Sequence, residues 1–183
     1  PKGVMLTHDN AVSNALSSLA IMYDGDPWTY LHTAPMFHIA DIQWNTGVTM
    51  QVGTHVFTKK FVPVEMLELI SRHQITHSAL VPTMVNMLCQ VPDVETYDVS
   101  SLRKLNFGGS SIAPSVIRRA REVFPNCQFI QGYGQTETSP NISMLLDKYN
   151  TDEGPYAGKI ESAGQPVFAM EVRIVDLDDM ELP

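Results

Sequence analysis

The chain has 183 residues, of which 44% are hydrophobic and 17% are charged, and its formal net charge is −8 at pH 7. This size and composition are those of one ordinary globular domain, and they exclude a disordered chain. A net negative charge without clustered Lys and Arg residues also excludes a nucleic-acid-binding surface.

No apolar run reaches the roughly 20 residues that cross a bilayer, and the N-terminus lacks the basic and apolar regions of a secretory signal. Cys89 and Cys127 lie in apolar stretches without a metal-binding or redox spacing, which predicts buried free thiols. We therefore expect a cytoplasmic protein, for which peripheral membrane association through an acyl substrate is an option. The sequence leaves the oligomeric state open, with a homodimer as one option.

Short apolar runs alternate with helical patterns, which predicts an α/β fold with a mostly parallel sheet flanked by helices. The first helical pattern runs from Val4 to Ala20. Proline at the first helical position costs no hydrogen bond, so Pro63, Pro82 and Pro114 mark further helix starts. The expected strands are residues 29–34, 55–58, 77–81, 102–107 and 127–130, and the other expected helices are 39–52, from 63 onward, 82–89 and 115–124.

The pattern changes after Ile142, where glycines and prolines interrupt the chain, and residues 171–176 alternate like a half-buried strand. We therefore expect an α/β subdomain over residues 1–160 and the incomplete start of a β-rich subdomain over residues 161–183. Because neither end looks like a natural terminus, we expect a piece of a longer enzyme.

The segment from Gln131 to Pro140, which reads QGYGQTETSP, follows the apolar run 127–130 and combines groups that suit a magnesium-bound nucleotide. Two glycines let backbone approach a ligand, a tyrosine offers a flat face for a base, and a hydroxyl and a carboxylate suit phosphate and Mg²⁺. Ligands of open α/β sheets bind where strands end. The alternative is a glycine turn into a helix capped by the threonine. These residues are Gly132, Tyr133, Gly134, Thr136 and Glu137.

Two further motifs follow expected strands. The turn Gly108-Gly109-Ser110-Ser111 would form the opposite wall of one cleft with the 131–140 segment, and it lacks the spacing of a hydrolase nucleophile elbow. His38 lies between an expected strand and an expected helix, where a helix-capping role is favoured by local sequence alone. His73 and His77 cross from helix to strand, so a zinc site is not expected.

Together these motifs resemble the adenylate-forming superfamily of acyl-CoA synthetases, luciferases and peptide-synthetase adenylation domains. The resemblance covers nearly the whole chain. Residues 1–4 are similar to the tail of the family's phosphate-binding loop, 35–41 to its substrate-gating motif, 108–111 to one wall of the adenine site, and 131–140 to its most specific signature. Residues 162–176 resemble the entry to a small β-barrel.

The resemblance implies an individual role for each residue of these motifs. Thr136 would hold the α-phosphate of ATP, Glu137 would bind Mg²⁺, and His38 would act as the gate beside the acyl pocket. Tyr133 would stack on adenine. The remaining nucleotide-binding positions would be Lys2 at the outer phosphates, Gln131 and Gly132 at the base edge, and Gly108, Gly109, Ser110 and Gly134 around the base and phosphates.

The reaction implied is activation of a carboxylic acid as an acyl-adenylate, followed by transfer to coenzyme A. A fatty acid is the favoured substrate because Phe37-His38-Ile39 occupies the gate, and an aryl acid is the second choice. The alternatives are a non-catalytic nucleotide-binding scaffold and, last, a hydrolase using Ser110 or Ser111 with His38. Since the family's ribose-binding aspartate and catalytic lysine have no counterpart in these residues, we expect the fragment alone to be inactive in thioester formation.

Overall fold

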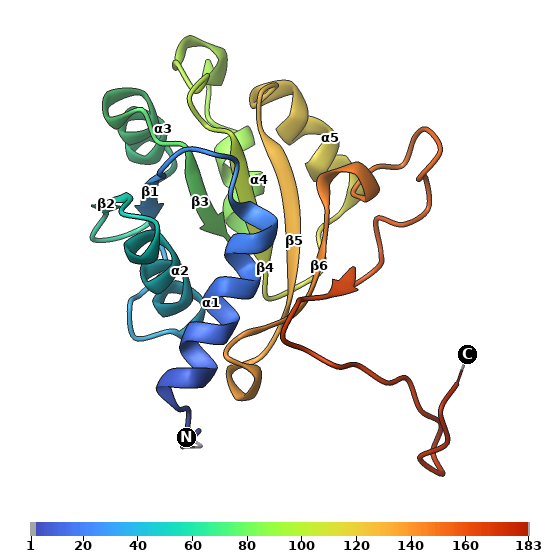
Figure 1. Cartoon of the computed structure of the whole chain (residues 1–183). Helices are drawn as coiled ribbons and strands as arrows, with labels where there is room; N and C mark the ends of the chain where they lie inside the picture. Colours follow the sequence, from blue (N-terminus) through green and yellow to red (C-terminus); the bar gives the residue numbers. More distant parts are fainter. Residues whose placement is uncertain (1–2, 183) are drawn as a thin grey trace.

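A computed structural model describes residues 3–182, and the structural statements below concern those residues. The chain forms a seven-stranded sheet in the order β2-β1-β3-β4-β5-β6-β7 with helices on both faces (Figure 1). Neighbouring strands from β2 to β5 are parallel, whereas β6 is antiparallel to β5 and β7 is antiparallel to β6. The predicted α/β fold with a mostly parallel sheet is confirmed.

The strands are β1 (Thr29–His32), β2 (Thr54–Phe57), β3 (His77–Leu80), β4 (Lys104–Gly108), β5 (Gln128–Gly134), β6 (Asn141–Leu145) and β7 (Gln165–Pro166). The helices are α1 (His8–Met22), α2 (Ile39–Met50), α3 (Pro63–His73), α4 (Pro82–Cys89) and α5 (Pro114–Val123). Short 3₁₀ turns lie at Val94–Thr96, Thr136–Thr138 and Asp147–Tyr149.

The helix starts follow from local chemistry. Prolines occupy the first position of α3, α4 and α5, as predicted, and none of these helices has a side-chain cap. The helix α1 begins at His8 and not at Val4, because Thr7 and Asn10 form a reciprocal capping box: the Asn10 amide donates to Thr7 Oγ1 at 3.1 Å and the Thr7 amide donates to Asn10 Oδ1 at 2.9 Å.

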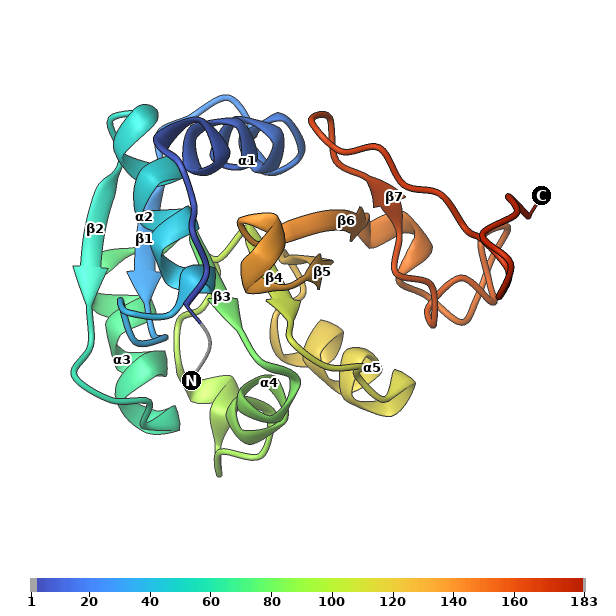
Figure 2. The same ribbon diagram turned by 90° about the horizontal axis from the view of Figure 1, so that it is seen from below.

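Each face of the sheet carries its own hydrophobic core. Figure 2 shows α1 and α2 on one side of the sheet and α3, α4 and α5 on the other. Successive strand residues point to opposite faces, so Phe129 packs with the second group of helices and Ile130 with the first. The sheet is therefore buried on both sides, and its strand ends are the accessible places for ligands.

The C-terminal third differs from expectation in its strands. The predicted strand 127–130 extends through Gly134, and its partner β6 was not predicted at all. Arg121 donates to Asp147 Oδ1 at 2.8 Å and to the Asn150 carbonyl at 3.2 Å. Asp147 in turn accepts the Phe129 amide at 2.8 Å, so these bonds tie the chain after β6 to α5 and β5.

The predicted strand 171–176 is wrong for this structure. Residues 171–176 are all exposed, and the only β-type pairing of this segment among the described residues is an isolated bridge between Val175 and Glu181. Figure 1 shows the segment after β7 running away from the sheet. An alternating pattern forms a strand only where a neighbouring strand supplies hydrogen bonds, and here a local turn takes that place.

The predicted boundary at residue 160 stays a prediction. β7 hydrogen-bonds to β6, and Val167 packs in the core beside α1 and α2. The large apolar residues that follow Val167 are mostly exposed, with Phe168 and Leu177 almost fully so.

Both cysteines are free and buried, as predicted. Burial raises the pKa of Cys89 to about 11 and raises that of Cys127 further. Thiolates are the reactive form of cysteine, so neither side chain is expected to react at neutral pH. Among the described residues, no helix combines the length and apolar character required for a membrane span.

A buried histidine predicts acid sensitivity. His77 stacks on Trp28 with ring centroids 4.3 Å apart, and burial lowers the pKa of His77 from its ordinary 6.5 to about 3. Its Nε2 lies 3.8 Å from Asp24, whose carboxylate already accepts two bonds from Arg103. Between pH 6.5 and pH 3, His77 is therefore protonated in the unfolded chain but neutral in the folded one.

As the pH is lowered through that window, the free energy of unfolding should decrease. His77 contributes up to about 1.4 kcal/mol per pH unit to this decrease. Denaturant unfolding between pH 7 and pH 4 measures this slope. His77→Phe keeps an aromatic ring against Trp28 but cannot be protonated, so it should flatten the slope. An equally steep slope in that variant would assign the acid sensitivity to other groups.

Candidate active site

A cavity of about 590 Å³ lies at the carboxyl ends of β1, β3, β4 and β5. Residues from the first half of α2 line one side of it. Its apolar lining includes Ile39, Trp44, Ala79, Leu80, Val81 and Met84, and its polar lining includes Thr33, His38, Asp41, Gln43, Asn106, Gln135, Thr136, Glu137 and Asn141. This is the place where open α/β sheets bind ligands.

The structure brings most of the predicted site residues to this one cavity. Gly108 and Gly109 line it from β4, Gly132 and Gly134 from β5, and His38, Thr136 and Glu137 complete the set. Ser110, Gln131 and Tyr133 do not line it. Lys2 lies outside the described residues.

Tyr133 has a different position from the neighbouring glycines. It shares a sheet face with Phe129, whereas Gly132 shares the opposite face with Ile130. Gly108 pairs with Gly132 at the last register position of β4 and β5, and Gly109 follows β4 directly. Tyr133 is 53% exposed, so a ligand can reach it.

The loop that follows β5 is held by its own hydrogen bonds. Thr136–Thr138 forms a 3₁₀ turn capped by Gln135, so Thr136 does not cap a helix. The Gln135 amide donates to the Pro140 carbonyl at 3.0 Å, and the Thr138 hydroxyl lies 2.6 Å from the same oxygen. These bonds fix the Thr136 and Glu137 backbone while their side chains remain exposed.

A second clamp on this loop comes from α1 and was not predicted from sequence. Asn14 Nδ2 donates to the Asn141 carbonyl at 2.8 Å and to the Thr138 carbonyl at 3.1 Å, and Asn14 Oδ1 accepts the Asn141 amide at 3.2 Å. The two asparagines are 127 positions apart. No local sequence signal connects them.

Gly134 is the position where this loop tolerates no side chain. A Cβ added there would lie 1.8 Å from the Pro140 carbonyl oxygen, which is a backbone atom and cannot rotate away. Gly134→Ala should therefore displace the Thr136–Glu137 backbone and cost about 1–3 kcal/mol or more. Gly3→Ala is the control for chain flexibility, since a Cβ added there would meet nothing within 4 Å and its φ is not positive. Thermal unfolding of both variants measures the difference in stability. Equal losses in the two variants would contradict the steric argument.

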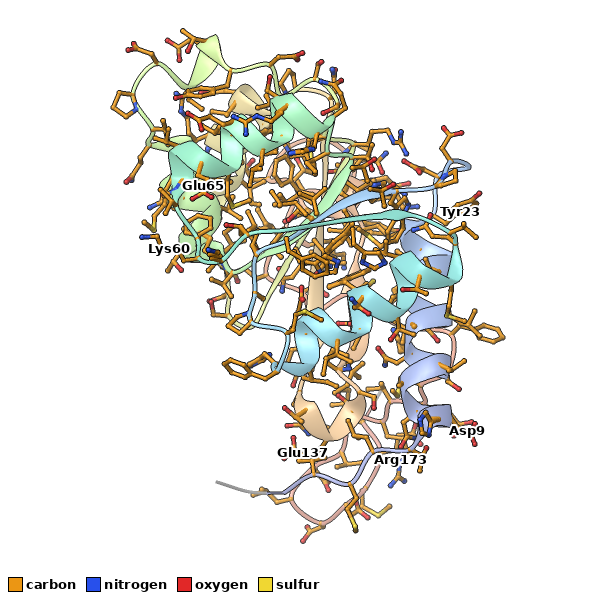
Figure 3. All side chains as sticks on the ribbon, turned by 90° about the vertical axis from the view of Figure 1, so that its left-hand side faces the viewer. Asp9, Tyr23, Lys60, Glu65, Glu137 and Arg173 are labelled. Carbon is orange, nitrogen blue, oxygen red and sulfur yellow. The ribbon has the colours of Figure 1, made fainter. Side chains whose placement is uncertain are left out.

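Glu137 lines two cavities. One is the cavity at the strand ends, and the other, of about 400 Å³, lies beside the first turns of α1. Figure 3 shows Glu137 on the short turn beyond the end of the sheet. Within residues 3–182 its carboxylate has no hydrogen-bond or ion-pair partner, and no cluster of three or more acidic, His or Cys residues surrounds it.

A single free carboxylate fits Mg²⁺, which keeps most of its water and phosphate ligands and takes one or two from protein. It does not fit zinc, which requires three or four protein ligands. His73 and His77 end α3 and begin β3, as expected from sequence.

His38 is the N-cap of α2, as the local sequence favoured, and its Nδ1 accepts the Ala40 amide at 3.4 Å. The same residue is exposed and lines the cavity mouth with Pro35. The capping bond is long, so the imidazole is only weakly held.

A buried chain of polar side chains extends from the cavity wall to the surface. Asp41, which lines the cavity, has its two carboxylate oxygens 3.0 and 3.1 Å from His32 Nδ1. His32 Nε2 lies 2.9 Å from His55 Nδ1, and His55 Nε2 lies 3.1 Å from Thr49 Oγ1. Neither His32 nor His55 was predicted from sequence as a site residue.

Hydrogen bonds connect these side chains in series. Thr49 Oγ1 also donates to the Asn45 carbonyl at 2.8 Å, which holds the outer end of the series on α2. At the inner end, both carboxylate oxygens of Asp41 lie beside His32 Nδ1, so this carboxylate has a buried partner at the cavity wall. Burial lowers the pKa of His55, and the neighbouring His32 lowers it further.

Comparison with known proteins identifies the family. The sequence model of a family described as AMP-binding enzyme matches residues 1–183. The chain belongs to this family. A 4-coumarate–CoA ligase from Petroselinum crispum is 35% identical over 96% of this chain, and one from Pinus taeda is 33% identical over 99% of it. The chain spans about a third of the length of these ligases, 33% and 34% respectively.

Solved AMP-binding structures share the fold. The N-terminal domain of FACL13 from Mycobacterium tuberculosis superimposes with a TM-score of 0.88 at 26% identity, over 100% of this chain and 44% of that one. The o-succinylbenzoate coenzyme A synthetase MenE from Bacillus subtilis, in complex with ATP and magnesium ion, gives 0.83 at 26% identity, over 100% of this chain and 36% of that one.

Proposed function

We propose that this AMP-binding chain is the nucleotide- and acid-binding part of an AMP-forming acid–CoA ligase. The observation that carries the proposal is that the two cavities meet at Glu137. Glu137 lines both a mostly apolar cavity and a second cavity with a more polar lining, and its neighbour Thr136 lines the first, so an acid and a nucleotide phosphate can meet there. CoA-ligase relatives and a magnesium–ATP-bound structural neighbour support the same reaction.

In the first step a carboxylate oxygen of the acid attacks the α-phosphorus of ATP. The bond from that phosphorus to the pyrophosphate oxygen breaks, and pyrophosphate leaves with the electron pair. Because charge develops on the phosphoryl oxygens, positioned hydrogen-bond donors and cations supply most of the acceleration. The Thr136 hydroxyl is the donor proposed for the α-phosphate.

Glu137 would hold Mg²⁺, which when bound neutralises the phosphate charge. The clamps from Asn14 and from within the 134–141 loop keep Thr136 and Glu137 in place without help from a ligand. A preorganised site does not lose free energy by ordering itself at the moment of reaction.

In the second step the thiol sulfur of coenzyme A attacks the acyl carbonyl carbon, the thiol proton is lost to solvent or base, and AMP leaves with the former carboxylate oxygen. The base of the nucleotide is proposed to lie against Tyr133, beside Gly109 and Ser110. Gln131 and Gly132 would contact the base edge. Lys2 is proposed for the outer phosphates.

The acid is uncharged beyond its carboxylate in this proposal. The cavity lining is mostly apolar. Apart from Glu137, which is proposed for Mg²⁺, its one carboxylate among the described residues is Asp41, whose two oxygens lie 3.0 and 3.1 Å from His32 Nδ1. A fatty acid and an aryl acid both satisfy this condition. The aryl acid is favoured equally by the ligases named for 4-coumarate.

The test is ATP–pyrophosphate exchange by the longer protein that carries this chain, across fatty, aryl and amino acids. Exchange with fatty or aryl acids supports the proposal. Exchange only with amino acids would overturn the substrate class, and nucleotide binding without exchange for any acid would leave a binding scaffold in its place.

The 183-residue chain alone is expected to form no acyl-CoA. The family's catalytic lysine has no counterpart in residues 1–183, according to the resemblance set out above. Thioester formation by this chain, followed with a thiol reagent that detects free coenzyme A, would contradict the expectation.

A further inference from the structure

Helix α1 packs on the rest of the protein with a largely polar face. Its buried residues are Asn14, Ala15, Ser17, Ser18 and Met22, so three of the five are polar. A helix that covers a sheet usually buries an apolar stripe, and a buried polar side chain is unfavourable unless it is hydrogen-bonded. The position of α1 is therefore decided by the bonds of its polar side chains as well as by apolar packing.

These bonds reach the segment that follows Glu137. The Asn14 side chain is bonded at both ends, because its Nδ2 donates to the Thr138 and Asn141 carbonyls and its Oδ1 accepts the Asn141 amide. Ser18, one turn further along α1, accepts from Asn141 Nδ2 at 3.1 Å. Asn14 is only 1% exposed, so solvent does not compete for its bonds.

The first turns of α1 and the Thr136–Thr138 turn are also two walls of one cavity. The cavity of about 400 Å³ is lined by Asn10, Ser13 and Asn14 from α1 and by Glu137, Thr138 and Ser139 from the turn and the residue after it. Figure 3 shows the start of α1, labelled at Asp9, and Glu137 at the same end of the molecule. Lys2, proposed above for the outer phosphates, lies shortly before this helix in the sequence.

The turn needs an external support because its own side chains do not pack. Thr136 and Glu137 are exposed, so no buried surface holds them. The bonds within residues 134–141 fix the shape of the turn, whereas the bonds from Asn14 fix its position relative to α1. A reacting group that moves by about 1 Å can lose about 10²-fold in rate, so this position is important for catalysis.

We propose that Asn14 is a positioning residue for acyl-adenylate formation. It acts through the Thr136 hydroxyl, by holding the Thr136–Thr138 turn in one position relative to α1 and to the segment that precedes this helix. The inference rests on the proposed function, in which Thr136 donates to the α-phosphate. Asn14 itself contacts neither the acid nor the reacting atoms in this account.

The experiment is a double-mutant cycle between Asn14→Ala and Thr136→Val, measured by ATP–pyrophosphate exchange in the longer protein that carries this chain. Asn14 lines the second cavity, so water can reach the backbone groups that N14A frees. We expect N14A to lower kcat by about 10²-fold and to change KM for the acid by less than about 3-fold, because the lost interaction is made in the transition state.

The coupling between the two positions distinguishes positioning from general destabilisation. In the wild-type protein T136V should cost about 10²–10³-fold, but in N14A it should cost less than about 3-fold more, because a displaced hydroxyl contributes little. A merely structural role of Asn14 would leave the two losses additive.

Ser17→Ala is the matched control in the same helix. Ser17 is 2% exposed, but its hydroxyl donates to the Ser13 carbonyl of α1 itself. S17A should leave kcat almost unchanged, and T136V should cost as much in S17A as in the wild-type protein.

Additive losses in the cycle, or a raised KM for the acid with unchanged kcat, would overturn the positioning role and leave the proposed function standing. Absence of exchange by the wild-type protein with every acid would overturn both. If N14A does not fold, Asn14→Ser takes its place in the cycle. Failure of both variants to fold would show that the contact serves the fold, and would overturn the positioning role.

Discussion

Replacement of Glu137 by glutamine is expected to slow acyl-adenylate formation by about 10²-fold or more, because the amide has no charge for a Mg²⁺ ion beside the phosphates. The side chain is exposed and has no partner among the described residues, so the change should leave stability almost unaltered. Pyrophosphate exchange at several Mg²⁺ concentrations measures the effect. The loss should be partly recovered at high Mg²⁺.

Glu153→Gln, in an exposed loop, removes the same charge away from the cavity and serves as the control. Thr136→Val should slow the same step by about 10²–10³-fold, since it removes one donor to the transition state, without changing the Mg²⁺ dependence. Wild-type rates in Glu137→Gln would contradict the assignment of the metal site.

A large loss of stability is expected from Asp41→Leu. This change removes the carboxylate that lies against His32 Nδ1, and both side chains are at most 3% exposed. Removal of one partner of a buried hydrogen-bonded pair costs about 1–3 kcal/mol, and more for charged groups, because the remaining polar group is left without a partner. Urea unfolding at pH 7 measures the difference.

The control for Asp41 is the double replacement His32→Leu with Asp41→Leu. Replacing both partners of a buried polar pair by apolar side chains can be nearly neutral, so the double variant should be more stable than the single one. Glu122→Leu, at the exposed Arg119–Glu122 pair, should have no comparable effect. A double variant less stable than D41L would show that the His32–His55 contact contributes more to stability than the His32–Asp41 contact does.

Sequence alone predicted the parts of the fold that depend on local signals. The prolines at 63, 82 and 114 fixed three helix starts, because proline at the first turn is a local property of the backbone. Apolar runs located the five parallel strands, since strands buried on both faces are continuously hydrophobic.

Features that depend on distant residues were missed. β6 was not expected because its partner β5 and the Asn14 clamp come from elsewhere in the chain, and nothing within residues 141–145 indicates them. The strand expected at 171–176 failed for the converse reason: its alternation is local, but no described strand lies beside it.

The candidate site shows the same division. The glycines, Thr136, Glu137 and His38 were predicted from motifs and lie around one cavity. The motif did not show that Tyr133 points to the other sheet face from Gly132, because the expected strand stopped at residue 130 and the real one continues through Gly134. The buried pair His32–Asp41 carries no motif, and only its arrangement in space connects it with the cavity.

The most direct measurement of the central claim follows one oxygen atom. An acid labelled with oxygen-18 in its carboxylate is converted to its thioester by the longer protein that carries this chain, and the released nucleotide is analysed by mass spectrometry. Attack of the carboxylate on the α-phosphorus predicts one labelled oxygen in AMP. Label in inorganic phosphate, or unlabelled AMP, would contradict the account.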